Sequence, residues 1–391
     1  MPNNHIMNLL NLEGIIIKRI KHADNYMKII IETEATTQTC PCCHQQTKQI
    51  HDYRYQKIKD LPMQFKDCYL VLRKRRYRCK CGKRFYEKYP FLARYQQRTT
   101  RLTKYIANDL RKSISINAVA EEANVSHSTV TRILDTIHYS SLPLKDAIAI
   151  DEFKGNAETG KYQCIIVNPK QNYIMDILPD RSQSHLSAYF KEIKRSDRHR
   201  VKFFVCDMWQ PYVDLAYSYF PNAKVIIDKY HFIRHVTWAI EKVRKNLQKT
   251  MPTNLRKYYT RSRKLILTRY SKLKDENKEA CDLMLLYNDD LRKAHMLKEW
   301  FYDICQNPKY SVQRVEFFEL IKNAASCGIE AFEKCAKTFR HWSKEILNAF
   351  KYGLTNGITE GFNNKIKVLK RISYGIRKFE RFRTRILHSC N

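Results

Sequence analysis

The chain has 391 residues, of which 43% are hydrophobic, so it is long enough for several domains and can bury substantial cores. It carries 72 Lys and Arg residues against 39 Asp and Glu residues, a formal net charge of +33. Such an excess destabilises a compact fold by self-repulsion and is expected where the partner is a polyanion, which favours nucleic acid. Because the basic residues are spread along the whole chain and no uncharged apolar run approaches the length of a membrane span, a membrane partner is disfavoured.

The start of the sequence lacks the charged opening, apolar segment and small-residue cleavage site of a secretory signal, so we expect a reducing cytoplasmic location. Thirteen cysteines is an odd number, and six of them fall within the first 81 residues. Disulfides are rare in a reducing compartment, so this cluster favours a metal site over a disulfide framework.

Residues 1–95 contain alternating stretches such as YMKIIIET and CYLVLRKRRYRC, which predict a β-rich module. Two close cysteine pairs on turns can give four thiolates the tetrahedral geometry of structural Zn²⁺. The second pair has a one-residue spacer, shorter than usual, and Cys42 could replace Cys40 or Cys43. Scattered buried cysteines are the alternative. The predicted zinc ligands are Cys40, Cys43, Cys79 and Cys81, and the predicted phosphate contacts between the pairs are Arg73, Lys74, Arg75 and Arg76.

Residues 96–142 have helical periodicity, and SINAVAEEANVSHSTVTRILDTI fits a helix-turn-helix. The turn is expected at Asn124-Val125, with Ser126 as the N-cap of the second helix. The side chains expected to face inwards are Val119, Ala120, Ala123, Val130, Ile133 and Leu134. The second helix would enter the major groove, where its candidate base or phosphate contacts are His127, Ser128, Thr131 and Arg132. An ordinary helical hairpin is the alternative.

From residue 146 to 231, five apolar strands and two amphipathic helices alternate, which predicts a mixed α/β sheet. The strands are AIAIDEF, YQCIIVN, YIMDILP, VKFFVCD and AKVIID, and the helices are SHLSAYFKEIKR and PYVDLAYSYF. Residues 232–350 are almost continuously helical in pattern. Residues 351–391 are again helical, and they are predicted to form a C-terminal helix and a basic tail.

Two of the strands end in aspartates, Asp151 and Asp207, at the position where α/β sheets commonly bind ligands. Glu152 points to the opposite face from Asp151, so we choose Asp151. The predicted third acid, Glu360, begins the helix in NGITEGFNNKIKVLKR. Three carboxylates can hold two Mg²⁺ or Mn²⁺ ions for phosphoryl transfer, although strand-end and helix-start acids are often simple caps. The DNA strand would be held by Lys365, Lys367, Lys370 and Arg371.

Secondary candidates surround these acids. Asp228 and His231 in VIIDKYHF follow another strand, and each is a candidate to lie near the metal ions, with a buried structural histidine as the alternative. Arg181 in LPDRS is expected to grip a phosphate or to pair with Asp180. Trp209 is expected either to stack on a flipped base or to join the core. The tryptophans expected to pack within helices are Trp238, Trp300 and Trp342.

Several motifs together resemble the DDE-class bacterial insertion-sequence transposases of the ISL-three family. They are CPCC with RYRCKCGKRFYE, AVAEEANVSHSTVTRIL, AIDEFKG, LPDRS, FFVCDMWQPY, VIIDKYHFIRHV and NGITEGFNNKIKVLKRISYGIRKFERFRTRIL. The resemblance implies a multidomain α+β protein, with a zinc-binding segment, a helix-turn-helix and an RNase H-like core interrupted by a helical insertion. It also implies that Asp151, Asp207 and Glu360 form the catalytic triad.

The resemblance further implies a function. A chain of this kind would bind the terminal inverted repeats of its element, cleave the 3′ ends and join them to target DNA. It would act near the bacterial nucleoid as at least a dimer. The rival hypothesis is a non-catalytic zinc and helix-turn-helix regulator, which leaves the three acids unexplained, and a degenerate inactive copy is a third possibility.

Overall fold

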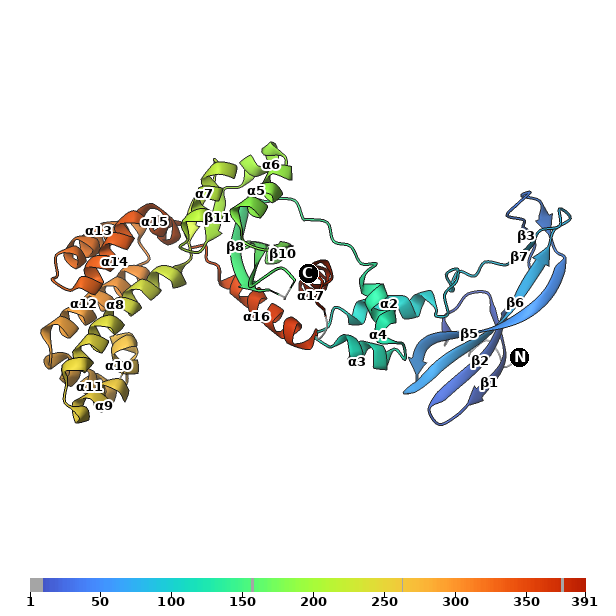
Figure 1. The fold of residues 1–391 in the computed structure, drawn as a ribbon, viewed down its shortest axis with the longest axis horizontal. Coiled ribbons are helices and arrows are strands. Elements are labelled where there is room, and N and C mark those ends of the chain that lie inside the picture. The colour runs from blue at the N-terminus through green and yellow to red at the C-terminus, as the bar shows by residue number, and fades with distance from the viewer. Residues whose placement is uncertain (1–9, 156–157, 262, 374–375) are drawn as a thin grey trace. The chain divides into compact units, whose positions relative to one another are not determined.

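The computed structural model describes residues 10–155, 158–261, 263–373 and 376–391 (Figure 1). The chain divides into two compact units. We call the first the N-terminal unit; it comprises residues up to Ser140 together with Lys365–Asn391. We call the second, Ser141–Asn364, the central unit. The first nine residues of the predicted zinc module lie outside the described residues.

The N-terminal unit is built on a sheet in the order β1-β2-β6-β5, with β7 paired to β6. Alternation of apolar and polar residues directs one face of this sheet into a core that also includes Phe91 and Leu92. The β-rich prediction is confirmed for the described residues of this region. Its strands are β1 (Ile15–His22), β2 (Tyr26–Thr33), β3 (Gln38–Thr39), β4 (Gln46–Thr47), β5 (Ile50–Met63), β6 (Lys66–Arg78) and β7 (Arg84–Tyr86).

Three helices follow the sheet: α2 (Thr100–Asp109), α3 (Ile116–Glu122) and α4 (His127–Leu134). The turn between α3 and α4 contains Asn124 at a φ of 48°, in the left-handed region that asparagine tolerates. The Ser126 side chain accepts a hydrogen bond from the backbone N–H of Thr129 and so caps α4. All six side chains predicted to face inwards are buried, including Ala123 at the end of α3. The predicted helix-turn-helix is confirmed in each of these details.

The end of the chain belongs to the same unit. Helix α17 (Phe379–Cys390) contains Arg385, which is fully buried and donates to the carbonyl oxygens of Lys112 (3.0 Å) and Ile114 (2.8 Å). Arg381 forms two hydrogen bonds of 2.7 Å with Asp135 at the end of α4. The expectation of a basic tail therefore needs correction, because basic residues of α17 are tied to the helix-turn-helix.

The central unit contains a five-stranded sheet in the order β10-β9-β8-β11-β12. The first three strands are antiparallel, whereas β11 pairs in parallel with both β8 and β12. Residues 147–150 of β8 are fully buried, as expected of a strand at the centre of a covered sheet. The strands are β8 (Ala147–Lys154), β9 (Tyr162–Asn168), β10 (Tyr173–Leu178), β11 (Phe203–Cys206) and β12 (Lys224–Ile227).

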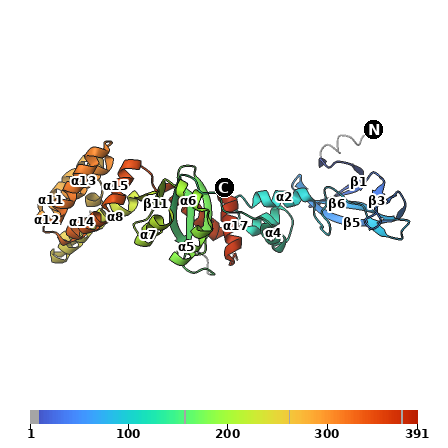
Figure 2. The same cartoon turned by 90° about the horizontal axis from the view of Figure 1, so that it is seen from above.

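Helices α5 (Gln183–Glu192), α6 (Arg195–Arg200) and α7 (Gln210–Tyr219) connect the strands, and Figure 2 shows α5 and α7 beside the sheet. After β12 the described residues up to 352 form helices without strands, as the sequence predicted. They are α8 (Lys229–Thr250), α9 (Thr253–Arg261), α10 (Arg263–Leu267), the 3₁₀ helix η1 (Tyr270–Lys272), α11 (Asp275–Leu286), α12 (Asp289–Gln306), α13 (Tyr310–Ala325), α14 (Glu330–His341) and α15 (Ser343–Tyr352). Helix α16 (Gly357–Ile372) begins in the central unit, and its residues from Lys365 onward belong to the N-terminal unit.

None of the helices in the described ranges is both long and apolar enough to span a membrane.

Candidate active site and DNA-binding surfaces

Two of the predicted acids lie side by side on adjacent strands. Asp151 is in β8 and Asp207 directly follows β11, and each lies two residues beyond the paired residues Ala149 and Val205. Burial, together with the nearby charge of Asp207, raises the pKa of the Asp151 carboxyl to about 7. The predicted proximity of these two acids therefore agrees with the sheet register.

Two asparagines of the α16 segment contact these aspartates. The Asn356 amide donates to Asp207 Oδ1 (3.5 Å) and to the carbonyl oxygen of Ile150 (3.4 Å). The Asn363 amide donates to Asp151 Oδ2 (2.8 Å). Glu360 lies four residues after Asn356 and three before Asn363, so it shares their face of the helix.

The Glu360 side chain itself is exposed. Among the described residues, the four cysteines of the zinc module form a group whose ligand atoms all lie within 4.8 Å of one another. Asp151, Asp207 and Glu360 do not meet this distance. The three acids thus do not form one tight cluster. Ligands divided between two ions need not all meet at a single point, and the assignment of Glu360 as the third acid stays a prediction.

Asn363, three residues after Glu360 on α16, was not singled out from the sequence. Asn363 is buried, and its Oδ1 accepts no hydrogen bond from the described residues. A buried amide oxygen without a donor is costly unless a ligand satisfies it. This side chain therefore offers a free oxygen next to Asp151.

His231 and Asp228 fix the surroundings of the aspartates. His231 Nε2 lies 2.9 Å from Asp207 Oδ1. Burial of His231 lowers its pKa, but this hydrogen bond and the nearby acidic charges together outweigh burial, so the pKa is raised. The Asp228 carboxylate caps α8 through the N–H of Tyr230 (3.1 Å) and also accepts the N–H of Asn356 (2.8 Å). Asp228 therefore attaches the start of α16 to the end of β12.

Arg181 pairs with a different acid from the one expected. Its guanidinium forms a hydrogen-bonded ion pair with Glu152, not with Asp180. Asp180 instead accepts hydrogen bonds from Ser182 at the start of α5 and contacts His185 (2.6 Å). The guanidinium also lies 4.8 Å from the ring centre of Trp209, which is only partly buried.

The atoms around Asp151 and Asp207 that could bind a metal ion include carboxylate oxygens and the amide oxygen of Asn363. Oxygen is the ligand type that Mg²⁺ and Mn²⁺ prefer, and the unpaired Asn363 oxygen is the kind of atom that a bound cation or its water would satisfy. The residues present therefore fit a divalent-cation site.

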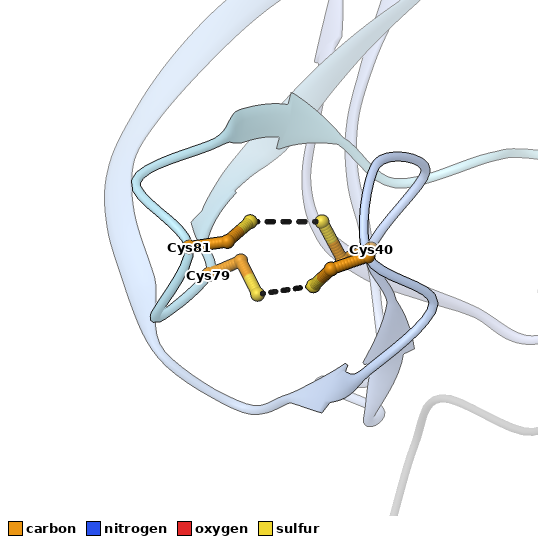
Figure 3. A group of neighbouring side chains, drawn as sticks. Cys40, Cys79 and Cys81 are labelled. Atoms are coloured by element: carbon orange, nitrogen blue, oxygen red, sulfur yellow. Dashed lines mark hydrogen bonds between the residues drawn. The ribbon is translucent and has the colours of Figure 1, made fainter.

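The four predicted zinc ligands come together in the N-terminal unit. The Cys40 and Cys81 sulfurs are 3.7 Å apart and those of Cys43 and Cys79 are 3.4 Å apart, and Figure 3 shows Cys40, Cys79 and Cys81 directed at a common point. Tetrahedral Zn–S bonds of ~2.3 Å require sulfur separations of ~3.8 Å. Hydrogen bonds from the backbone N–H groups of Cys43 and Cys42 lower the pKa of the Cys40 thiol to about 6, which favours the thiolate. Cys42 is exposed and lies outside the group.

The predicted phosphate contacts of β6 differ in exposure. Arg75 is buried, where it lies 3.5 Å from Glu87 and donates to Thr33, so we drop it from the predicted contacts. Arg76 forms a two-bond pair with Asp52. Arg73 contacts Glu32 (3.2 Å) and lies over the Tyr53 ring, while Lys74 donates to Gln56 (3.0 Å). Long basic side chains here also hold the sheet together.

The candidate contacts on the helices are more accessible. His127, Ser128 and Arg132 are exposed on α4, and Thr131 is half-buried and donates to the carbonyl of His127. Lys365 is exposed on α16 and donates to the Ser389 carbonyl. The remaining exposed basic candidates of α16 are Lys367, Lys370 and Arg371.

The tryptophans expected to pack are not alike. Trp342 is 8% exposed and packs as predicted, and Trp300 is half-buried. Trp238 is 52% exposed, so the packing prediction is wrong for this residue. It lies on the side of α8 away from the buried Phe232, Val236 and Ile240.

Three family models cover these regions. A transposase model of the ISL3 family matches residues 148–386, more than half of the chain. The chain belongs to the ISL3 transposase family. A model of the zinc finger of the transposases IS204, IS1001, IS1096 and IS1165 matches residues 36–81, and a model of the helix-turn-helix domain of transposase family ISL3 matches residues 87–138. The first contains Asp151, Asp207 and Glu360, and the second contains all four clustered cysteines.

The chain is also similar to curated proteins. It is 27% identical over 392 aligned positions to a transposase for insertion sequence element IS1001 from Bordetella parapertussis, covering 95% of this chain and 94% of that protein. It is 37% identical over 89 residues to a protein named as an ATP-dependent protease from Lactococcus lactis subsp. lactis, covering 22% of this chain and 28% of that protein. The full-length similarity and the ISL3 family together identify a DNA transposase with a helix-turn-helix for DNA and a zinc-finger module.

The zinc cluster makes a first prediction. Replacing Cys43 with Ser should remove the metal, because three thiolates bind zinc much less tightly than a closed set of four. The exposed Cys42→Ser variant, one residue away, is the matched control and should retain about one zinc ion per chain. Elemental analysis of the purified proteins measures both. Loss of zinc from the Cys42 variant with retention by the Cys43 variant would reverse the ligand assignment.

Proposed function

We propose that this ISL3-family transposase binds the terminal inverted repeats of its insertion sequence and performs metal-dependent cleavage and strand transfer at Asp151, Asp207 and Glu360. The observation that carries the proposal is a pair of contacts, one from α16 and one from the residue that directly precedes it. Asn356 and Asn363, which flank Glu360 on its helix face, hydrogen-bond to Asp207 and Asp151 respectively. We propose that a helix held in this way would bring the third acid to the site of the other two.

The central sheet supports an RNase H-like catalytic core over residues 146–231. The sheet has three antiparallel strands followed by two parallel strands, with Asp151 on the central strand β8 and Asp207 directly after its neighbour β11. This is the arrangement expected of such a core. We further propose that residues 232–350 are a helical insertion and that the catalytic part resumes at 351. The Asp228 contact to the Asn356 backbone supports this, because it joins the two ends of the helical region.

Bound Mg²⁺ or Mn²⁺, as two ions, would supply an activated water or 3′-hydroxyl nucleophile and would stabilise the leaving oxygen. The chain's own residues hold and orient the ligands. Asn363 fixes the Asp151 carboxylate through its amide N–H and presents its free oxygen to the same site. His231 holds Asp207 in place through its Nε2 atom.

The zinc module and the helix-turn-helix are proposed to find the element ends, with Zn²⁺ held by Cys40, Cys43, Cys79 and Cys81. The exposed N-terminal part of α4 is proposed to enter the major groove, where His127, Ser128 and Arg132 would contact bases or phosphates. The +33 charge supports a DNA partner. Since two element ends must be held together for strand transfer, we propose a dimer or larger assembly on DNA.

A non-catalytic DNA-binding regulator remains the rival function. The acid pair disfavours it, because keeping two carboxylates together in a partly buried site raises the pKa of Asp151 and destabilises the fold unless the site is used. Perturbed acids of this kind gather at functional sites more often than elsewhere.

The catalytic assignment predicts the behaviour of acid-to-amide variants. Asp151→Asn, Asp207→Asn and Glu360→Gln should each lower Mg²⁺-dependent nicking of an element-end duplex by about 10²-fold or more, the scale for losing one preorganised electrostatic contact. The duplex sequence comes from the inverted repeats that flank the gene. Nicking is measured on labelled DNA in gels, and DNA binding by the same variants should stay close to that of the parent chain.

Asp197→Asn is the matched control, because that carboxylate lies on α6, outside the proposed site, and forms a surface ion pair with Arg200 at 3.6 Å. It should nick at the parental rate. Undiminished nicking by Glu360→Gln would remove Glu360 from the triad, and undiminished nicking by all three variants would remove the proposed active site.

A separate prediction concerns Asn363 as a positioning residue. Asn363→Ala should raise the Mg²⁺ concentration needed for half-maximal nicking by about 10- to 100-fold, the usual scale for losing a group that orients a metal ligand. Asn364→Ala, at the exposed neighbouring position, should leave the metal requirement unchanged. If Asn363→Ala lowers the rate at every Mg²⁺ concentration without changing the metal requirement, Asn363 is structural and does not orient the ligand.

A further inference from the structure

We propose that the exposed face of α8 is a binding site for an unstacked nucleobase of the DNA strand next to the cleaved phosphate, with Trp238 as the stacking platform. The site consists of Tyr230, Arg234 and Trp238, at intervals of four residues on α8, and we call it the α8 stripe. It deepens the proposed function, on which it rests for the position of the cleaved phosphate.

The side chains of the α8 stripe are exposed, and the packing of α8 does not depend on them. Tyr230 is 63% exposed and Trp238 is 52% exposed, whereas Phe232, Val236 and Ile240 on the other side of α8 are buried in the helical region. The buried side therefore already anchors the helix. Large aromatic side chains left in solvent at a regular spacing are typical of surfaces that bind a flat ligand.

Arg234 connects the two rings. Its guanidinium lies 4.2 Å from the ring centre of Trp238 and 5.8 Å from that of Tyr230. The contact with Trp238 is a cation–π interaction that limits the freedom of both side chains, so the ring is held ready in the free protein. The guanidinium lies over the ring and places a positive charge there, where it can contact a phosphate of the same nucleotide.

The position of the α8 stripe on the helix selects the ligand. His231, which holds Asp207, lies on the same side of α8 as Trp238 and seven residues before it. Seven residues correspond to about 10 Å along the helix axis. This is about three base steps of stacked DNA, so a strand that runs along α8 from a phosphate at Asp207 would meet Trp238 within a few nucleotides.

The charge of α8 favours DNA over a protein partner. The helix has six Lys and Arg residues and a single acid, Glu241, which is buried and pairs with Arg244 (2.8 Å). Bases in an intact duplex hide their faces by stacking, so only an unpaired or extruded base can cover the Trp238 ring. Stacking on an aromatic side chain does not depend strongly on which base is present, so the site would accept any unpaired base near the cleaved phosphate.

The first test is photocrosslinking with the full chain carrying Asp207→Asn, so that no cleavage is needed. The probes are element-end duplexes with 5-iodouracil at each of the positions flanking the cleaved phosphate, because this base crosslinks to aromatic side chains on which it stacks. We expect a crosslink to Trp238 or Tyr230 from one or two adjacent positions. Probes that bind but crosslink elsewhere, or not at all, would overturn the proposal.

The second test separates stacking from structure. Trp238→Ala should slow nicking of an ordinary end duplex by about 5- to 150-fold, the loss expected for one base–aromatic stack, and Trp238→Phe should restore most of the rate. On a duplex with an abasic residue at the crosslinked position, Trp238→Ala and the parent chain should nick equally fast. Phe318→Ala, at a 45% exposed aromatic of α13, is the control and should behave as the parent.

The results distinguish the two proposals. Equal slowing of Trp238→Ala on the ordinary and abasic duplexes, or no slowing on either, would overturn the base-binding site. A crosslink to Trp238 in a chain whose Asp207→Asn variant still nicks would support the base-binding site while removing the proposed catalytic acids.

Discussion

The central unit depends on holding two like charges together at the end of a buried strand. Asp151 and Asp207 emerge from neighbouring parallel strands, and burial, together with the repulsion between the two acids, raises the pKa of Asp151 to about 7. Three contacts offset this cost. The His231 imidazole and the Asn356 amide contact Asp207, and the Asn363 amide contacts Asp151. Each of these partners is neutral or cationic and donates a hydrogen bond, which is what a pair of carboxylates requires.

A further contact fixes the segment that carries Glu360 to the sheet. The segment that carries Glu360 is separated from the sheet by a long series of helices, so it needs an anchor of its own. Asp228 supplies one, because it caps α8, where the helical region begins, and also accepts the backbone N–H of Asn356, where that region ends. A structural carboxylate at this point lets a large helical region be attached to the sheet without displacing the acids.

Much of this arrangement could be predicted from local pattern. Apolar runs ending in Asp151 and Asp207 indicate adjacent strand ends, Ser126 and Asn124 indicate the cap and turn of the helix-turn-helix, and paired cysteines indicate zinc. The exposure of Trp238 could also be predicted from the sequence, because positions 232, 236 and 240 of α8 form an apolar stripe on another side of the helix. This periodicity contradicts the prediction that Trp238 packs within the helices.

The remaining features depend on tertiary contacts that a single sequence does not specify. The inward turn of Arg75 to Glu87 and the pairing of Arg181 with Glu152 are choices among several acids within reach of a long side chain. The docking of α17 on the helix-turn-helix joins residues far apart in the chain. Asn363 illustrates this difference, because the helix that contains it was predicted, whereas its unpaired buried oxygen results only from packing.

The convergence of three distant acids on one metal site is the central claim, and metal-directed backbone cleavage tests it most directly. Fe²⁺ replaces Mg²⁺ in the DNA-bound chain, and ascorbate with peroxide generates hydroxyl radicals that cut the polypeptide beside the ion. We predict cuts around residues 151, 207 and 360 together, all suppressed by excess Mg²⁺. Cuts near 151 and 207 without any near 360 would contradict the account.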